Sequence, residues 1–387
     1  MLDLALGIGG LLFSIWVVAA VWAGAWVRAF RAPSGVPWEV ITSDGWTLHV
    51  HRYPPQGAPR GGPPVILGHG FMMNQWCWSL SEAGSLPIAL SRRGHDVYVA
   101  EYRGSGASAN PPAKGHERRG GGLDGWRFGD HVQFDLPAII DGVRAISGSE
   151  TVHWVGHSMG GMAGYSYALK TGGGKLASLV TIGSPARFGH IKGLFGPTGP
   201  LALRLLRKVH LLRVRLLVKL LLPFTAIAPT LSMRTSGPAH YLSLGERFTL
   251  MAEAFANTSP ALTGFFVDLG ENDRRLISSE PGEPSFRDLT VPTLILGGVN
   301  DVLAPPTAHR VPFDEAQPGR VAYRLFGDPS LPDGEAGPGL GHADLISGET
   351  AIQYVLPVLA RWLEADAPLR LPEFRTNPDK SPHMKAV

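Results

Sequence analysis

The hydrophobic and polar positions divide the chain into an apolar N-terminal segment and a long region of short alternating elements. Residues 4–27 carry no charged side chain and consist mainly of Leu, Ile, Val, Ala and Trp. At ~1.5 Å per residue, a helix of this length crosses the roughly 30 Å hydrocarbon core of a bilayer. We therefore predict a transmembrane anchor over residues 1–31, in which Trp22 and Trp26 suit the membrane interface.

A cleaved signal peptide is the alternative interpretation of this segment. Signal peptides begin with basic residues and have a shorter apolar stretch. This chain instead has Asp3 before the run and Arg28 and Arg31 after it, which favours an uncleaved anchor. Because basic residues are enriched on the cytoplasmic side of single-pass proteins, we expect the rest of the chain to face the cytoplasm.

After a Pro- and Gly-containing hinge, short apolar runs alternate with helix-length stretches. The runs expected to form strands are Glu39–Thr42, Thr47–Tyr53, Pro64–Leu67, Asp96–Ala100, Thr151–Val155, Leu179–Ile182, Thr293–Leu296 and Val321–Leu325. Helices are predicted between several of them, over Leu80–Arg93, Phe134–Ser147 and Gly160–Lys170. Strands that alternate with helices indicate a mostly parallel sheet covered on both faces.

The alternation stops over residues 187–288, where no strong strand pattern occurs. We interpret this segment as a helical cap inserted into a core formed by residues 38–186 and 289–366. Residues 367–387 contain Pro and Lys and are expected to form a loose tail.

The predicted cap contains a basic stretch, residues 201–222, without any acidic residue. Its basic side chains are Arg204, Arg207, Lys208, Arg213, Arg215 and Lys219. A basic amphipathic helix can lie on an anionic membrane surface. Alternatively, it covers the site with its leucines and leaves its charges in water. In either case the cap would line an apolar pocket, with Phe265 and Phe266 among the candidates.

The amino-acid composition excludes several functional classes for this protein. Of the 387 residues, 44% are hydrophobic and 17% are charged, so the chain can build a sizeable core. A formal net charge of +3, without a basic-aromatic cluster, does not support nucleic-acid binding. The single cysteine, Cys77, excludes an intrachain disulfide and a thiolate zinc site. His49 and His51 alternate on one predicted strand, but no third ligand is evident, so no metal or cofactor is expected.

Residues 152–161 hold the sharpest chemical signal. An apolar strand leads into Gly156-His157-Ser158-Met159-Gly160, and a helix of small residues follows. A G-x-S-x-G turn between a strand and a helix lifts the serine hydroxyl clear of the sheet, and its glycines allow a close approach that side chains would block. We predict that Ser158 is a nucleophile, the alternative being an ordinary strand-to-helix turn.

A serine hydroxyl needs a base to take its proton, and with this turn an acid and then a histidine follow the serine in the chain. Asp301 comes directly after the strand Thr293–Leu296, and His342 lies in the loop after the last predicted strand. We expect Asp301 to fix the imidazole tautomer and His342 to act as general base and then general acid. Asp333 and Asp344 are the rival acids and His309 is the rival base.

The tetrahedral intermediate of acyl transfer needs two preorganised backbone N–H groups. Met159, directly after the nucleophile, is expected to supply one. Phe71, in the loop after the strand Pro64–Leu67, is the candidate for the other. His69 in the same loop is expected to be structural.

Over about residues 38–365 the chain resembles the α/β-hydrolase superfamily, and within it the acid-lipase group of gastric and lysosomal lipases and their bacterial relatives. The resemblance rests on His69-Gly70-Phe71, Tyr102-Arg103-Gly104, Trp126 to Asp130, and Phe134-Asp135-Leu136-Pro137-Ala138. It implies the α/β-hydrolase fold and activity on lipid-like esters. Met159 stands where that group usually has Gln.

These features together predict a membrane-associated serine ester hydrolase, similar to lipases and esterases, that cleaves acyl esters through an acyl-enzyme on Ser158 without a cofactor. Two alternatives stay open. One is an acyltransferase that uses the same triad, and the other is a non-catalytic membrane-tethered binding protein that keeps the fold.

Overall fold

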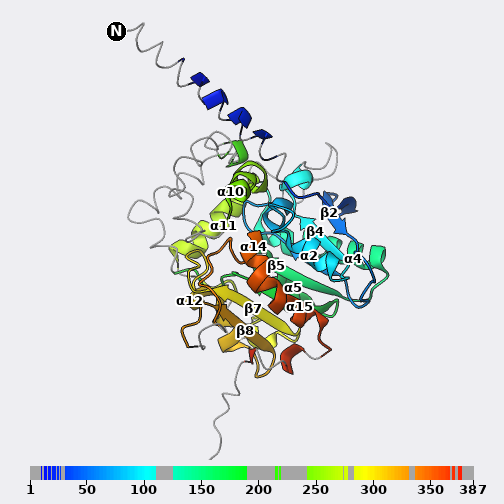
Figure 1. Ribbon diagram of the computed structural model, residues 1–387. Helices are drawn as coiled ribbons and strands as arrows, with labels where there is room; N and C mark the ends of the chain where they lie inside the picture. The colour runs from blue at the N-terminus through cyan, green and yellow to red at the C-terminus, as the bar shows by residue number, and fades with distance from the viewer. Residues whose placement is uncertain are drawn as a thin grey trace, which may run out of the picture.

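The structure is a computed structural model of the chain (Figure 1). It describes residues 31–109, 125–189, 242–272, 274–277, 283–330, 336–366, 368–370 and 374–376, and single residues between 10 and 27 and between 214 and 218.

Within these residues, nine strands form one sheet in the order β1-β2-β4-β3-β5-β6-β7-β8-β9. The strands are β1 (Val36–Ile41), β2 (Thr47–Tyr53), β3 (Val65–Gly68), β4 (Val97–Glu101), β5 (Val152–His157), β6 (Leu176–Ile182), β7 (Thr293–Gly298), β8 (Val321–Phe326) and β9 (Arg375–Thr376). Strands β3 to β8 pair in parallel, whereas β1, β2 and β9 are antiparallel to their neighbours. The mostly parallel sheet and the eight predicted strands are confirmed.

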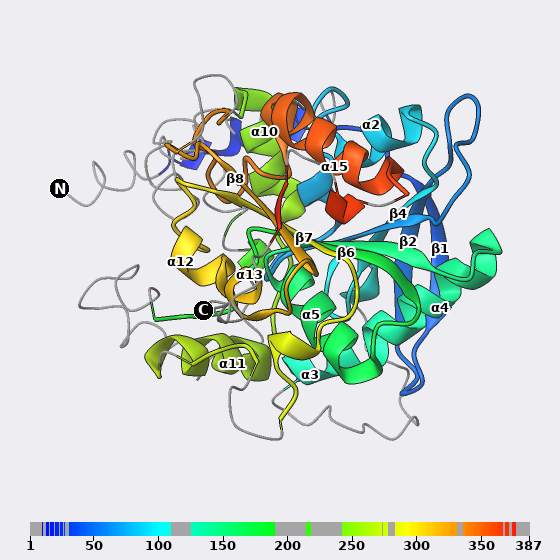
Figure 2. The same cartoon turned by 90° about the horizontal axis from the view of Figure 1, so that it is seen from below.

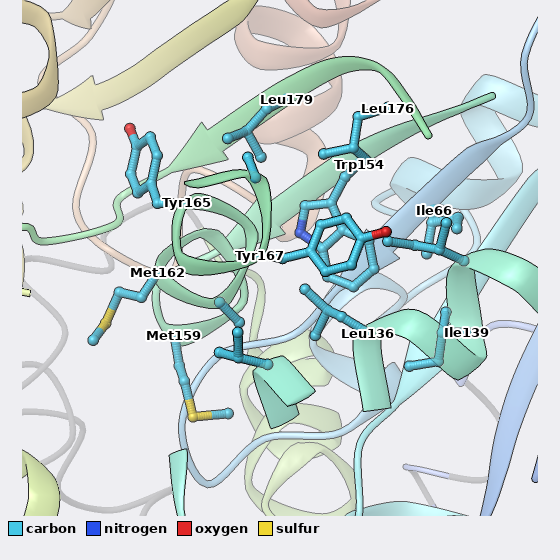
Figure 3. Packing of buried hydrophobic residues seen from close by; sticks show 14 of the residues in the cluster. Ile66, Leu136, Ile139, Trp154, Met159, Met162, Tyr165, Tyr167, Leu176 and Leu179 are labelled. Carbon is cyan, nitrogen blue, oxygen red and sulfur yellow. The ribbon is translucent and has the colours of Figure 1, made fainter. Parts of the chain in front are cut away.

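Two helical layers cover the sheet (Figure 2). Helices α4 (Leu136–Ser147) and α5 (Met159–Thr171) lie on one face, and α2 (Leu86–Arg92) and α15 (Leu356–Glu364) lie on the other. The strand side chains alternate between the layers: Ile66 and Trp154 pack with α4 and α5, and Val155 packs with α2 and α15. Figure 3 shows the first of these clusters. This alternation of buried residues is the period of two expected for a strand with both faces covered.

The remaining described helical elements are mostly short, and α11 is the longest of them with 12 residues. They are η1 (Gln75–Trp78), η2 (Gly106–Ala109), α3 (Phe128–Asp130), η3 (His131–Asp135), α10 (Leu244–Thr249), η5 (Leu250–Ala254), α11 (Pro260–Glu271), η6 (Phe286–Asp288), α12 (Pro306–His309), α13 (Val311–Glu315), α14 (Gly348–Thr350), η7 (Ala351–Val355) and η8 (Pro368–Arg370).

The helix before β4 and the C-terminal tail differ from the sequence-based expectation. The helix predicted over Leu80–Arg93 begins only at Leu86, because the Ser85 side chain caps it by accepting from the Ile88 N–H. In the tail that we expected to be loose, β9 pairs with β8. The buried ring of Phe374 packs edge-on against Trp362 beside this pairing and holds the segment in place.

The described parts of the predicted cap are mostly helical, with isolated bridges at Phe255 and between Arg187 and Arg275, and they contact the loop after β3. The Asn74 N–H donates to the Ala254 carbonyl (3.0 Å), and the Ala256 N–H donates to the Met72 carbonyl (2.8 Å). The end of η5, which continues directly from α10, is therefore joined to the loop after β3. Most of the basic stretch 201–222 lies outside the described residues.

Most of the predicted anchor, including Trp26, also lies outside the described residues. Among those that are described, no helix combines the length and the apolar character needed to cross a bilayer. Val27 is buried against Phe248 and Ala252, and Trp22 meets the edge of the Phe248 ring at 6.0 Å. The N-terminal residues therefore reach α10 and η5 (Figure 1).

Candidate active site

Ser158 occupies a strained turn between β5 and α5. Its φ is +51° and its ψ is −118°, a conformation that residues with a side chain rarely adopt. Its N–H donates to the Ile182 carbonyl at the end of β6 (2.9 Å), which fixes the turn to the neighbouring strand. Strain of this kind persists only where the surroundings hold it, and it is concentrated at functional sites.

Glycines make this turn possible. A Cβ at Gly156 would lie 2.3 Å from the Gly160 carbonyl carbon, and a Cβ at Gly160 would lie 2.3 Å from the Gly68 oxygen. Both separations are shorter than real Cβ atoms show. The serine turn and the end of β3 can therefore approach each other only because side chains are absent at these positions.

Asp301 and His342 are joined by a hydrogen bond. His342 Nδ1–H donates to Asp301 Oδ2 (2.8 Å), and both residues are buried. The other oxygen, Asp301 Oδ1, accepts from the N–H groups of Leu303 (2.9 Å) and Ala304 (2.7 Å). The carboxylate is thus fixed by three donors, and the imidazole is left with Nε2 to exchange a proton.

The pair lies beside the serine turn. Gly183 follows the strand end that binds Ser158, and a Cβ on it would lie 3.0 Å from Asp301 Oδ2 and 3.2 Å from His342 Nδ1. The His157 ring, next to Ser158 in the chain, lies 4.5 Å from the His342 ring between centroids. The Asp301–His342 pair therefore lies beside the serine turn, at the edge where the parallel strands end and where open α/β sheets bind ligands.

The two predicted oxyanion-hole residues flank the same turn. Met159 is the first residue of α5, where helix N–H groups lack partners in a preceding turn. Phe71 follows Gly70, and a Cβ on Gly70 would lie 3.1 Å from Ser158 Cβ. The loop after β3 thus packs directly on the serine turn.

His69 is held as a neutral structural residue. Its Nδ1–H donates to the Gly70 carbonyl (2.9 Å), and its Nε2 accepts from the Tyr102 N–H (3.3 Å). Burial lowers the pKa of His69 to about 4. The ring therefore fixes the loop that carries Phe71, as the sequence predicted.

The alternative candidates for the catalytic acid and base do not lie in the same environment as Asp301 and His342. Asp344 Oδ2 accepts from the Gly341 N–H (2.9 Å) and so closes the turn around His342. His309 is fully buried and stacks on Tyr323 at 5.6 Å, and burial lowers its pKa to about 4. Asp333 lies outside the described residues.

A buried ion cluster beside the site was not predicted. Arg103 Nε donates to Asp135 Oδ1 (2.8 Å), and its Nη1 and Nη2 donate to Asp44 (2.8 and 3.0 Å). His131 Nδ1 also donates to Asp135 (2.8 Å). We define Asp44, Arg103, His131 and Asp135 as the Arg103 cluster. It joins the turn after β1, the turn after β4 and the helix before the serine strand.

His51 belongs to another buried pair. Its Nε2 lies 3.2 Å from Glu101 Oε2, whereas His49 is partly exposed and lies 3.9 Å from Glu39. In the part of the chain that the structure describes, no three His, Cys, Asp or Glu side chains gather in a way that suits a metal ion.

Comparisons with known proteins show which sequences and folds this chain is similar to. Residues 37–82 match a family model described as a partial alpha/beta-hydrolase lipase region. Triacylglycerol lipase 2 of Arabidopsis thaliana is 30% identical over 135 residues, which cover 33% of this chain and 32% of that protein. Human gastric triacylglycerol lipase is 31% identical over 136 residues, 33% of each chain. The matched region thus spans about a third of the length of these relatives.

A solved structure of a hydrolase from Pseudomonas aeruginosa superimposes with a TM-score of 0.54 at 18% identity, covering 86% of this chain and 99% of that one. The family model described as the alpha/beta hydrolase fold matches residues 63–329. That region runs from just before β3 to just after β8 and includes both Ser158 and Asp301. The chain therefore belongs to the alpha/beta hydrolase fold family.

Proposed function

We propose that this protein is a serine hydrolase of carboxylic esters, similar to lipases and esterases. The observation that carries the proposal is the 2.8 Å hydrogen bond between His342 and Asp301, formed beside a serine held at positive φ. A buried acid that orients an imidazole next to a strained serine turn is the arrangement that activates a serine hydroxyl.

In the proposed reaction, Ser158 Oγ attacks the ester carbonyl carbon while His342 Nε2 takes the hydroxyl proton. The N–H groups of Met159 and Phe71 stabilise the oxyanion. The C–O bond of the ester then breaks, His342 gives its proton to the leaving alcohol, and the acyl group stays on Ser158. Water, deprotonated by His342, attacks the acyl-enzyme and releases the carboxylic acid.

The surroundings of Phe71 favour an apolar acyl group. The Phe71 ring lies 4.4 Å from the Phe266 ring of α11, and Phe266 in turn meets Phe188 and Phe265. Aromatic rings therefore adjoin the loop proposed to hold the oxyanion. The lipases among the relatives support lipid-like esters as the substrate class.

Labelling with a fluorophosphonate probe, followed by mapping of the modified peptide, tests this proposal. We expect wild-type protein to label at Ser158 and to hydrolyse p-nitrophenyl esters, with a preference that rises with acyl length. A folded protein that never labels would identify a non-catalytic binding protein. Acyl transfer to added alcohols in preference to water would identify an acyltransferase.

We also propose that the N-terminal segment anchors the protein in a membrane with the catalytic region on the cytoplasmic side. Support comes from the uncharged residues 4–27 and from Arg28 and Arg31 after them. The double variant Val17→Arg/Val18→Arg should move the protein from the membrane to the soluble fraction, since each arginine costs roughly 2.5–3.5 kcal/mol at the centre of a spanning helix. Equal membrane recovery of wild type and variant would contradict the anchor.

A further inference from the structure

His157, directly before Ser158, is a buried histidine that the proposed reaction does not use. It is 2% exposed, and its Nε2 lies 3.2 Å from the backbone oxygen of His342. A carbonyl oxygen can only accept, so Nε2 carries the proton and donates. Nδ1 is then unprotonated, and within the described residues this buried atom has no hydrogen-bond partner.

We propose that His157 is a positioning residue that holds the His342 backbone beside the nucleophile. This inference rests on the proposed function. Two hydrogen bonds fix His342: its ring nitrogen Nδ1 binds the Asp301 carboxylate, and its carbonyl binds the His157 ring. The hydrogen bond to Asp301 sets the side-chain torsion angles of His342 and thus the orientation of its imidazole. The second sets the position of the loop that carries the imidazole.

The second hydrogen bond links the loop to the nucleophile through one peptide. His157 and Ser158 are consecutive, so any shift of the His342 carbonyl relative to His157 is a shift of the general base relative to Oγ. A displacement of about 1 Å at a catalytic group can lower the rate about 100-fold. The contact between His157 and His342 therefore controls the distance between the general base and the nucleophile, although these two residues are far apart in the sequence.

The surrounding residues enclose the His157 ring and keep it neutral. The His342 ring lies 4.5 Å away, Trp78 meets it edge-on at 6.3 Å, and a Cβ at Gly70 would lie 3.1 Å from Nδ1. Burial lowers the pKa of His157 well below its ordinary value, and the nearby His342 and His69 lower it further. A neutral imidazole carries one N–H, and this N–H donates to the single acceptor, the His342 carbonyl.

Three substitutions separate positioning from general packing. Glutamine places an amide N–H near the position of Nε2, asparagine is polar but too short to reach, and leucine fills space without a donor. With a soluble p-nitrophenyl ester, we expect His157→Leu and His157→Asn to lower kcat by about 30- to 100-fold. KM should stay within about twofold, because substrate binding is not the interaction removed. His157→Gln should recover kcat to within about fivefold of wild type.

Circular dichroism and thermal unfolding of each variant define the folded fraction to which rates are normalised. If His157→Leu does not fold, the Gln and Asn variants carry the comparison. Equal kcat in the Gln and Asn variants, whether both low or both near wild type, would overturn the inference, and so would a loss confined to KM. Wild-type protein that neither labels nor turns over would instead reject the proposed function.

Discussion

Replacing Ser158 by alanine should abolish ester hydrolysis and fluorophosphonate labelling, with kcat falling by about 10⁴-fold or more. The loss follows from the proposed mechanism, because without Oγ no acyl-enzyme can form and His342 has no hydroxyl to deprotonate. The measurement is turnover of p-nitrophenyl esters and the intensity of the labelled band. Ser149→Ala is the matched control, since Ser149 precedes β5 at the end far from Ser158 and its hydroxyl donates to the nearby Thr151 carbonyl.

The same position allows an independent test of backbone strain. Alanine keeps a side chain at φ +51°, whereas glycine adopts this conformation without strain. Ser158→Gly should therefore be inactive and yet more stable than Ser158→Ala by about 1 kcal/mol in urea unfolding. A Ser158→Ala protein that still labels or turns over would show that another residue is the nucleophile, and the proposed mechanism would be wrong.

Local sequence patterns predicted the features that depend on neighbours in the chain. The eight strands follow from apolar runs of the right length, and the serine turn follows from Gly156, Ser158 and Gly160. The places of Asp301 and His342 were predicted because the carboxyl ends of parallel strands meet at one edge. In that respect the hydrogen bond between them agrees with the expectation from the sequence.

The contacts that the sequence did not reveal join distant residues without a local signature. Arg103 and Asp135 belong to motifs that we quoted for the family resemblance, but nothing in the chain shows that they pair, or that Asp44 completes the group. The His157 hydrogen bond was hidden for the same reason, because its acceptor is a backbone carbonyl. Such contacts depend on how the elements pack rather than on the residues around them.

The largest loss of stability is expected for Arg103→Met. Arg103 is 4% exposed and is the cation that binds both Asp44 and Asp135, while Trp46 and Phe134 lie within 5.4 Å of its guanidinium. Methionine fills much of the volume but leaves two buried carboxylates without that cation. Breaking a buried ion pair in this way costs about 3–5 kcal/mol.

Urea unfolding at constant m-value measures this loss, and Arg92→Met is the matched control. Arg92 pairs with Glu82, and the two side chains are 52% and 61% exposed. Exposed pairs contribute about 0–1 kcal/mol, so the control should lose about 1 kcal/mol or less. Equal losses for the two variants would show that the Arg103 cluster does not stabilise the fold.

The stability difference between wild type and Arg103→Met should also depend on pH. Burial raises the pKa of Asp44, but hydrogen bonds from Arg103 and Thr42 and the charge of Arg103 outweigh it and hold the pKa below its ordinary value. A lowered pKa in the folded state adds stability above the unfolded value of about 3.9, and that stability disappears as the pH falls through the folded pKa. The Arg103→Met variant lacks this contribution, because Asp44 loses the hydrogen bonds and the charge of Arg103 that hold its pKa down. The difference should therefore be full at neutral pH and narrow below about pH 4, whereas a loss caused only by poorer packing would stay constant with pH.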